Sequence, residues 1–400
     1  MLDVGLLRVT GAFRKEEGPA VWRITRYVGK AVLSALLLAM SCHKAGVAEV
    51  TNLPNIEPQS AAPNGFVMPV VPEGITALAI SRDGSRVAAG GHSSPQAGAI
   101  AIFDFNSGRP LGRIPGYVGS VVTSMEVLAF SPDGETVLSG GPGGLFVTRI
   151  DSANSQQLLA PETGVLIDAV FSGDGSRIVA ITTDFPSNST FVHVIDAQAG
   201  RELRSQSLPG VAQSDWQLIS PDGRWVLSDV KDNSFRLWDV ERDLAVRQVH
   251  LHRAMKLRQF LPSGELLFAT ARDGRLHILS ALTGRVVRRI DADWDEELLR
   301  DATTDSSRVL TMNNGSFTLW DVANGAKLRS FTIRNADGTH PWVARLTRDG
   351  RAALFGDSKG RVVLWDVEAG VELRSFMTDG AQSSGHHATS GASRTTTQPN

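Results

Sequence analysis

A four-residue turn that recurs at intervals of 41 to 50 residues is the strongest constraint on the fold of this 400-residue chain. Its clear copies are Ser81-Arg82-Asp83-Gly84, Ser131-Pro132-Asp133-Gly134, Ser172-Gly173-Asp174-Gly175, Ser220-Pro221-Asp222-Gly223 and Thr347-Arg348-Asp349-Gly350. Two degenerate copies lie between the fourth and the last, Leu261-Pro262-Ser263-Gly264 and Thr303-Thr304-Asp305-Ser306. Alternating apolar runs flank the turns, such as Ile75 to Ile80 and Arg86 to Ala89 around the first. Asp-Gly between such runs predicts a β-hairpin, because glycine accepts a positive φ and aspartate bonds the following backbone.

A second landmark follows each turn and, with it, defines four short strands per repeat. Its clear copies are Leu237-Trp238-Asp239-Val240, Leu319-Trp320-Asp321-Val322 and Leu364-Trp365-Asp366-Val367. The other repeats have Phe103-Asp104, Ile150-Asp151, Ile195-Asp196 and Leu279-Ser280 at the same phase. Glycine turns before and after these positions predict a third strand, and an apolar run such as Lys327 to Phe331 predicts a fourth. Four antiparallel strands in a period of this length are typical of one propeller blade.

These two landmarks resemble those of the WD-repeat (WD40-type) family over about three quarters of the chain. The resemblance implies an all-β fold, a seven-bladed β-propeller of four-stranded antiparallel blades, over residues 65–376. The family's Gly-His pair, which contributes to a His-to-Asp hydrogen-bond relay, is missing nearly everywhere. His252 and His340 lie near its place in two blades, whereas Gly91-His92 lies in a different loop. We therefore expect the packing of apolar faces to provide most of the stability.

The N-terminal segment has the pattern of an export signal. Three basic residues between positions 23 and 30 precede an apolar run from Ala31 to Met40, which is too short to span a bilayer. The stretch Leu38-Ala39-Met40-Ser41-Cys42 resembles the lipobox of bacterial lipoproteins, and Cys42 is the only cysteine. The resemblance implies cleavage between Ser41 and Cys42, with a lipid on the Cys42 thiol. The alternative is a plain secretion signal with an incidental cysteine.

The remaining segments complete the predicted organisation of the chain. Residues 1–41 are the extension and signal that processing removes, and Glu16 and Glu17 favour a translation start near Val21. Residues 42–64 are rich in Ala, Pro and Asn and read as a flexible tether. Residues 377–400 form a Ser-, Thr- and Gly-rich tail without apolar periodicity, which predicts disorder.

Two apolar runs compete for the outer edge of the last blade. Phe66 to Val71 has the pattern of an outer strand that closes the ring from the N-terminal side. Glu372 to Phe376 has the pattern of that blade's own outer strand. Only one of them can pair with the inner partner's edge.

The longer, irregular loops indicate where a partner would bind. The turns between first and second strands and between third and fourth strands fall at one end of the blades, so the variable loops gather at the other. These loops are Gly91 to Ala97, Pro115 to Ser124, Phe185 to Thr190, Pro209 to Asp215, Asp291 to Glu297 and Asn335 to Pro341. Binding loops vary whereas tight turns do not, so we expect the binding face at this end. Neutral drift in loop length is the alternative.

The sequence contains no strong catalytic or metal-binding motif. Asp291 to Glu297 resembles the start of a calcium loop, but Glu296 and Ala302 stand where glycine and an acid are required. His250 and His252 project to one side of a strand, and no third zinc ligand is evident nearby. We expect no metal, no cofactor and no enzymatic activity. A net charge of −2 also argues against nucleic acid as a partner.

These features together predict a monomeric, non-catalytic scaffold that is lipid-anchored in a bacterial envelope. It would face the periplasm or the exterior and bind a protein or peptide through the variable loops. One alternative is a quinoprotein-like propeller enzyme or small-molecule sensor with its ligand at the axial channel. Another is a secreted protein or a cytoplasmic adaptor.

Overall fold

The computed structural model describes most of the residues between Gly74 and Phe376. The described ranges are 74–92, 99–115, 127–141, 144–184, 187, 189–208, 217–231, 234–242, 245–251, 255–264, 266–271, 276–290, 298–313, 315–334, 340–341 and 343–376. The chain divides into two units, Met1–Ala61 and Ala62–Asn400, and all described residues belong to the second. Ser41 and Cys42, the tether and the C-terminal tail lie outside the described residues.

The described strands form seven four-stranded antiparallel sheets, each made of four consecutive strands. We call them blades 1 to 7 in chain order. Blade 1 has β1 (Gly74–Ile80), β2 (Arg86–His92), β3 (Ala99–Asp104) and β4 (Pro110–Pro115). Blade 2 has β5 (Val127–Phe130), β6 (Thr136–Gly141), β7 (Gly144–Arg149) and β8 (Ser155–Leu159). Blade 3, after a 3-10 turn η2 (Pro161–Thr163), has β9 (Val165–Phe171), β10 (Arg177–Asp184), β11 (Ser189–Asp196) and β12 (Glu202–Ser207).

The second half of the chain repeats the same order. Blade 4 has β13 (Gln217–Ile219), β14 (Trp225–Lys231), β15 (Ser234–Asp239) and β16 (Ala245–His250). Blade 5 has β17 (Met255–Phe260), β18 (Leu266–Ala271), β19 (Leu276–Ser280) and β20 (Val286–Ile290). Blade 6 has β21 (Leu298–Ala302), β22 (Arg308–Asn313), β23 (Ser316–Asp321) and β24 (Lys327–Thr332). Blade 7 has β25 (Val343–Leu346), β26 (Ala352–Gly356), β27 (Val362–Asp366) and β28 (Val371–Phe376).

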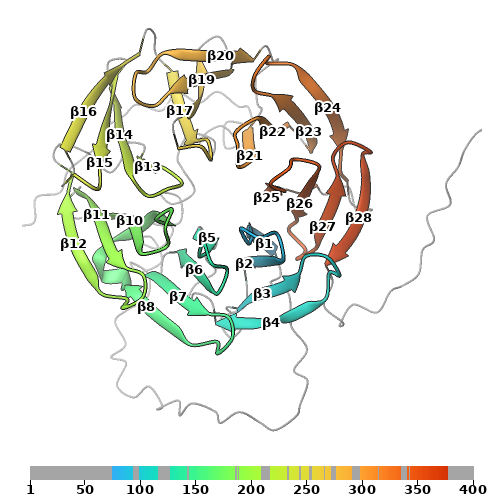
Figure 1. Cartoon of the computed structure of the whole chain (residues 1–400), viewed down its shortest axis with the longest axis horizontal. Coiled ribbons are helices and arrows are strands. Elements are labelled where there is room, and N and C mark those ends of the chain that lie inside the picture. The colour runs from blue at the N-terminus through green and yellow to red at the C-terminus, as the bar shows by residue number, and fades with distance from the viewer. Residues whose placement is uncertain are drawn as a thin grey trace, which may run out of the picture. The chain divides into compact units, whose positions relative to one another are not determined.

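The sheets are arranged in a ring with their first strands innermost (Figure 1). The inner strand β1 contacts β5 on one side and β25 on the other, so blades 1 and 7 are neighbours. Seven hydrophobic clusters lie between adjacent blades, one at each interface around the ring. The prediction of an all-β propeller with four-stranded antiparallel blades is therefore confirmed.

The ring closes without exchange of a strand. β28 pairs with β27 along its length, so the run that ends at Phe376 is the outer strand of blade 7. Phe376 is fully buried, and its ring packs edge-on against Phe103 of blade 1 with 5.7 Å between centroids. The backbone N–H of Ile75 donates to the Asp357 carbonyl at 2.8 Å across the same seam. The competing run, Phe66 to Val71, lies outside the described residues.

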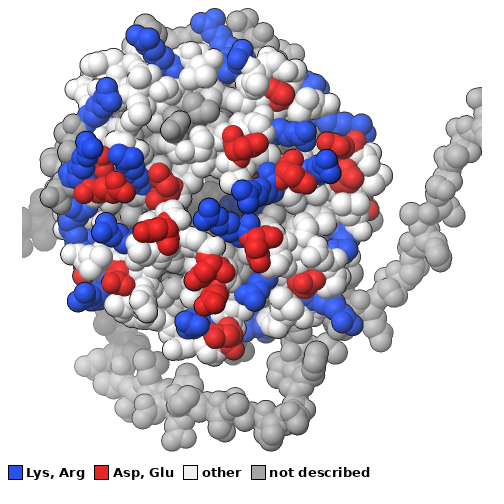
Figure 2. Space-filling view, in the orientation of Figure 1, with Lys and Arg blue, Asp and Glu red and all other residues white. Residues whose placement is uncertain are grey.

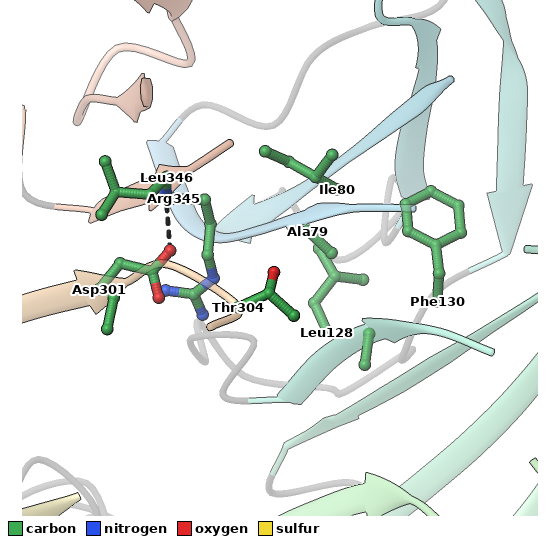
Figure 3. A pocket seen from close by; sticks show the side chains of 10 residues that line it. Ala79, Ile80, Leu128, Phe130, Asp301, Thr304, Arg345 and Leu346 are labelled. Atoms are coloured by element: carbon green, nitrogen blue, oxygen red, sulfur yellow. Dashed lines mark hydrogen bonds between the residues drawn. The ribbon is translucent and has the colours of Figure 1, made fainter. Parts of the chain in front are cut away.

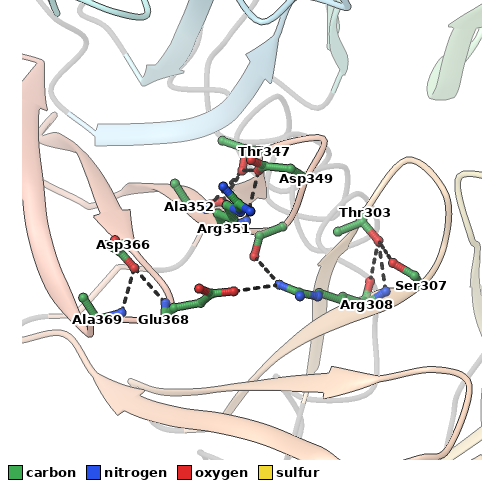
Figure 4. Close-up of polar contacts among 11 residues, drawn as sticks. Thr303, Ser307, Arg308, Thr347, Asp349, Arg351, Ala352, Asp366, Glu368 and Ala369 are labelled. Carbon is green, nitrogen blue, oxygen red and sulfur yellow. Dashed lines mark hydrogen bonds and ion pairs between the residues drawn. The ribbon is translucent and has the colours of Figure 1, made fainter.

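Each well-formed turn tetrad is held by its own hydroxyl and carboxylate. In blade 7 the Thr347 hydroxyl donates to Asp349 at 2.7 Å, and the same carboxylate accepts the N–H of Arg351 at 3.0 Å (Figure 4). The Thr347 hydroxyl oxygen also accepts the N–H of Ala352 at 3.1 Å. The closing glycine, Gly350, has a φ of 66°, which a side chain would strain. These bonds satisfy the polar groups of the turn between β25 and β26 with partners from the turn itself.

The degenerate turn of blade 5 lacks the hydroxyl-to-carboxylate hydrogen bond and has a buried apolar side chain in its place. Leu261 stands where the other turns have Ser or Thr, and its side chain is completely buried. The N–H of Gly264 still donates to the Leu261 carbonyl at 2.8 Å. The N–H of Ser263 donates to the Ser306 hydroxyl of blade 6 at 3.0 Å, so a neighbouring turn supports this one.

Arginine side chains also link successive turns. The Arg308 guanidinium of blade 6 donates to the Gly350 carbonyl of blade 7 at 3.2 Å and lies 3.5 Å from the Glu368 carboxylate (Figure 4). Arg86 of blade 1 donates to the Gly134 carbonyl of blade 2 at 2.8 Å. A charged donor held against a backbone carbonyl fixes the spacing of adjacent blades at this end of the ring.

Only part of the WD-type polar relay is present in the described residues. The indole N–H of Trp238 donates to the Ser228 hydroxyl at 2.7 Å, and that of Trp320 donates to the Thr311 hydroxyl at 2.9 Å. His340 is exposed, and His252 lies outside the described residues. The hydrophobic clusters between blades join the sheets where the relay is incomplete.

Candidate functional site

One register position of the inner strand is equivalent in all seven blades. It is the residue two places before each turn tetrad, and it pairs with an equivalent residue of the second strand in every blade. From blade 1 to blade 7 its occupants are Ala79, Ala129, Val170, Leu218, Gln259, Asp301 and Arg345. Two of the seven are charged, with opposite signs, and they stand on neighbouring blades.

Four of these residues line a cavity of about 260 Å³ beside the axis (Figure 3). The inner strands of blades 1, 2, 6 and 7 form its walls. One wall is apolar and contains Ile80, Leu128 and Phe130, whereas the other carries Asp301 and Arg345. Thr304, a residue of the blade 6 turn, also lines the cavity, which places the cavity at the end of the ring where the tight turns lie.

Asp301 is held in place by the neighbouring blade. Its Oδ2 atom accepts the backbone N–H of Leu346 at 2.7 Å. Burial raises the pKa of this carboxyl, and the positive charge of Arg345 and two backbone hydrogen bonds oppose the rise. The residue therefore presents a half-buried carboxylate to the cavity.

Arg345 directs its guanidinium toward the same space. Its Nη1 atom donates to the Ala344 carbonyl at 3.0 Å, and Figure 3 shows the guanidinium on the cavity side of the strand. Within the part of the chain that the structure describes, neither Arg345 nor Asp301 forms a direct ion pair. The cavity thus contains two opposite charges, each with hydrogen-bonding capacity left for a third group.

A second half-buried carboxylate lies on blade 3. Asp168 accepts backbone N–H groups from Ala169 and, across the blade boundary, from Ile219. Burial raises the pKa of Asp168 to about 6. Asp168 and Asp301 both bond the inner strand of the next blade just before its turn, so both act as links between blades. Only Asp301 borders the cavity.

A Thr-His-Glu relay on blade 3 has the connectivity of a catalytic triad but is structural. Thr182 Oγ1 lies 2.8 Å from His193 Nε2, and His193 Nδ1 lies 2.6 Å from Glu202 Oε1. The Thr182 hydroxyl also lies 3.2 Å from the Thr163 carbonyl oxygen and is buried, since the residue is 1% exposed. The relay ties β10, β11 and β12 together.

The variable-loop face that the sequence predicts falls largely on residues that the structure does not describe. Short pieces are described, such as Ser187, Ser189 and Thr190 in one loop and His340 and Pro341 in another. Asp291 to Glu297 lie outside the described residues, and His250 is exposed on β16. Among the described residues no group of three or more His, Cys, Asp or Glu is placed to hold a metal ion. The described segments also contain no helix with the length and apolarity to cross a membrane.

The charged cavity was missed because its residues look like ordinary strand residues. Asp301 and Arg345 are 44 positions apart and belong to different repeats. Aligning the seven inner strands on their turn tetrads would have placed both charges at one register position. Figure 2 shows acidic and basic side chains side by side around the centre of the face that it draws.

Comparison with known proteins supports the fold and leaves the function open. No protein family matches the chain. It is 23% identical over 187 residues to eukaryotic translation initiation factor 3 subunit I of Phaeosphaeria nodorum, a match that covers 43% of this chain. The match covers 54% of that protein, so the chain spans about half the length of this curated relative. This distant similarity supports a WD40-type propeller.

A solved structure gives similar support. Hydrazine synthase of Kuenenia stuttgartiensis superposes with a TM-score of 0.52 at 14% identity. The superposition covers 77% of this chain and 99% of that chain. At this identity the likeness concerns the fold alone.

Proposed function

We propose that this chain is a non-catalytic, WD40-type scaffold that binds a protein or peptide through its variable-loop face. It acts at a bacterial membrane, anchored by a lipid on Cys42 and facing the periplasm or the exterior.

The observation that carries the proposal is the way the polar groups of the turn tetrads are satisfied within the protein. The turn hydroxyls and carboxylates bond to one another and to their own backbone, as in Ser81, Asp83 and Ser85. Arg86 and Arg308 each donate a hydrogen bond to a backbone carbonyl in the turn of the next blade. We expect turns that are linked in this way to keep the blades, and therefore the loops at their opposite end, at a fixed spacing. Loops on such a frame can vary in sequence and length to fit a partner.

The distant relative is consistent with this role. Its name describes it as a subunit of a translation initiation factor, that is, a component of an assembly. Membership of an assembly requires a surface for other chains, and a propeller offers its loop faces for that purpose. The proposal carries over only the need for a protein partner and no part of the relative's process.

The scaffold is tested by capturing partners from membrane envelopes with the full chain. One variant has residues 209–215 and 291–297 replaced by Gly-Ser linkers of equal length. The control variant replaces two exposed outer-strand residues, Leu111 and Val287, with Ser. We expect one reproducible partner that the loop variant loses and the control keeps. A partner captured equally by both variants, or no partner at all, would contradict the proposal.

The anchor is tested separately by labelling cells with radioactive palmitate. The wild-type chain should incorporate label and remain with membranes after high-salt washing. Cys42→Ala removes the only thiol and should abolish both labelling and membrane retention. Cys42→Ser is the matched control for side-chain size and should behave as Cys42→Ala does. Membrane retention without labelling would rule out the lipid anchor and leave the scaffold role to be judged on the capture experiment.

A further inference from the structure

The axial cavity combines three chemical features at the end of the ring opposite the variable loops. A carboxylate comes from blade 6, a guanidinium from blade 7 and an apolar wall from blades 1 and 2 (Figure 3). We propose that this cavity binds a small zwitterion with an apolar side chain, that is, a free apolar α-amino acid. The inference goes beyond the scaffold role and does not depend on it.

The two charges define the polar half of the ligand. The Asp301 carboxylate keeps accepting capacity beyond its bond to the Leu346 N–H, and an ammonium group supplies donors to it. The Arg345 guanidinium bonds only the Ala344 carbonyl among the described residues and keeps a planar fork of donors for a carboxylate. An α-amino acid carries both groups on one carbon, which matches opposite charges on adjacent strands.

Partial burial makes these electrostatic interactions stronger than the same interactions in water. Burial has the largest effect on the pKa of the Asp301 carboxyl and raises it. The nearby Arg345 charge and two backbone N–H groups oppose this rise. A charge removed from water without an ion partner is costly, and a ligand that supplies the counter-charge removes that cost. Among the described residues Arg345 and Asp301 form no direct ion pair, so each keeps hydrogen-bonding groups for a ligand.

The apolar wall and the volume define the rest of the ligand. Ile80, Leu128 and Phe130 line the side of the cavity away from the charged pair and contribute apolar surface for an aliphatic or aromatic side chain (Figure 3). A volume of about 260 Å³ lies just below the range of about 300–1,000 Å³ typical of sites for larger ligands. The cavity therefore suits a molecule of amino-acid size.

The probes are L-leucine and L-phenylalanine, titrated calorimetrically into the full chain. We expect saturable binding of at least one of them at millimolar concentration or below. N-acetyl-leucine lacks the ammonium, leucinamide lacks the carboxylate and glycine lacks the apolar side chain. Each should bind at least tenfold more weakly than leucine. Equal binding of leucine and leucinamide, or of leucine and N-acetyl-leucine, would overturn the assignment, as would the absence of binding by both probes.

Variants locate the site. Asp301→Asn keeps an oxygen to accept the Leu346 N–H, and Arg345→Met keeps most of the side-chain length, so both should fold. Each should weaken leucine binding at least tenfold. Ala129→Phe fills the cavity without removing a charge and should abolish binding. Arg348→Met, an exposed arginine of the same blade outside the cavity, is the matched control and should bind as wild type.

The outcomes separate this inference from the scaffold role. Leucine binding that survives Arg345→Met and Ala129→Phe would place the ligand elsewhere and refute the inference. Partner capture should be unchanged in Arg345→Met, because the scaffold role uses the opposite end of the ring.

Discussion

The Nη1 atom of Arg374 donates a hydrogen bond to the Phe105 carbonyl at 2.7 Å, although the two residues are 269 positions apart. This bond joins the outer strand of blade 7 to the turn between the third and fourth strands of blade 1. The same contact recurs inside the chain. Arg204 of blade 3 donates to the Val240 carbonyl of blade 4, and Arg329 of blade 6 donates to the Ala369 carbonyl of blade 7.

The ring is therefore closed by the interaction that already links consecutive blades. A glutamine has the same role in blade 2, where Gln156 donates to the Ala199 carbonyl of blade 3 at 3.3 Å. Arg204, Arg329 and Arg374 each stand four residues after the glycine that ends the preceding turn. Because no strand is exchanged at the seam, side chains such as Arg374 and Phe376 replace the covalent link that joins every other pair of blades.

Removing the closing hydrogen bond should weaken the seam. Arg374→Met keeps the aliphatic part of the side chain and removes the charged donor. Hydrogen bonds to charged groups contribute about 1.5–3 kcal/mol, and this half-buried one should contribute about 1.5 kcal/mol to the free energy of unfolding in urea. Arg329→Met is the matched control, since its bond is longer, more exposed and inside the chain, and we expect a cost below about 1 kcal/mol. An equal effect of the two substitutions would show that the seam has no special dependence on Arg374.

Removing the aromatic contact at the seam should cost more. Phe376 is 1% exposed and belongs to the cluster between blades 7 and 1. Truncating a buried phenylalanine costs about 3–5 kcal/mol, so Phe376→Ala should bring the domain close to unfolding. Hydrogen exchange should show the earliest loss of protection in β1 and β28. Phe331→Ala, at a half-buried ring between Phe317 and Trp365, should cost clearly less. Uniform loss of protection in all blades would argue against a weak seam.

The alternating apolar runs and the Asp-Gly turns in the sequence predicted the repeating part of this fold well. The run Val127 to Phe130 is a strand with those bounds, and the Asp-Gly turns adopt the positive φ at glycine that their sequence requires. The strand that completes blade 7 was not predictable from pattern alone, because both candidate runs alternate in the same way. Burial of Phe376 against Phe103 decides in favour of the C-terminal run, and that is a contact between the two ends of the ring.

The charged cavity lay beyond those rules for a related reason. A strand residue that faces the axis has the same local pattern as one that faces solvent. Only the arrangement of the blades brings Asp301 of blade 6 beside Arg345 of blade 7. The loops that the sequence favoured for binding lie largely outside the described residues, so that expectation stays a prediction.

Asp168 should make the protein less stable as the pH rises through 6. Burial raises its pKa to about 6, above the ordinary aspartate value of 3.8. The carboxyl thus favours the folded state fully below about 3.8, and this contribution is lost as the pH rises through about 6. Asp168→Asn should therefore stabilise the domain at pH 8, by about 1–2 kcal/mol, and have little effect at pH 4. Thermal unfolding at the two pH values measures the difference, and a variant destabilised at both would contradict the argument.

Asp83 should show the opposite trend. Hydrogen bonds from the Ser81 and Ser85 hydroxyls and from the Ser85 N–H lower its pKa to about 2. Its contribution is present above the unfolded value near 3.8 and is lost as the pH falls through about 2. Asp83→Asn should cost up to about 1 kcal/mol at pH 7 after allowance for its solvent exposure, and this cost should disappear below about pH 2. Asp83→Asn and Asp168→Asn both remove one carboxylate, so opposite pH trends cannot arise from net charge.

The three tryptophans of the WD-type landmark should differ in what their indole N–H contributes. Trp238 and Trp320 donate to Ser228 and Thr311, whereas the buried Nε1 of Trp365 has no hydrogen-bond partner. The register explains the difference, because blade 7 has Phe355 where blades 4 and 6 have those hydroxyl residues.

Substituting phenylalanine therefore has different consequences in blades 6 and 7. Trp320→Phe loses packing and a hydrogen bond and leaves the Thr311 hydroxyl without that donor, so it should cost about 2–3 kcal/mol. Trp365→Phe loses similar packing but removes a buried, unbonded N–H, whose burial costs about 1–3 kcal/mol. The two terms nearly cancel, and we expect Trp365→Phe to stay within about 1 kcal/mol of wild type in urea unfolding. Equal destabilisation by the two substitutions would mean that the Trp365 N–H is satisfied in solution by a water molecule.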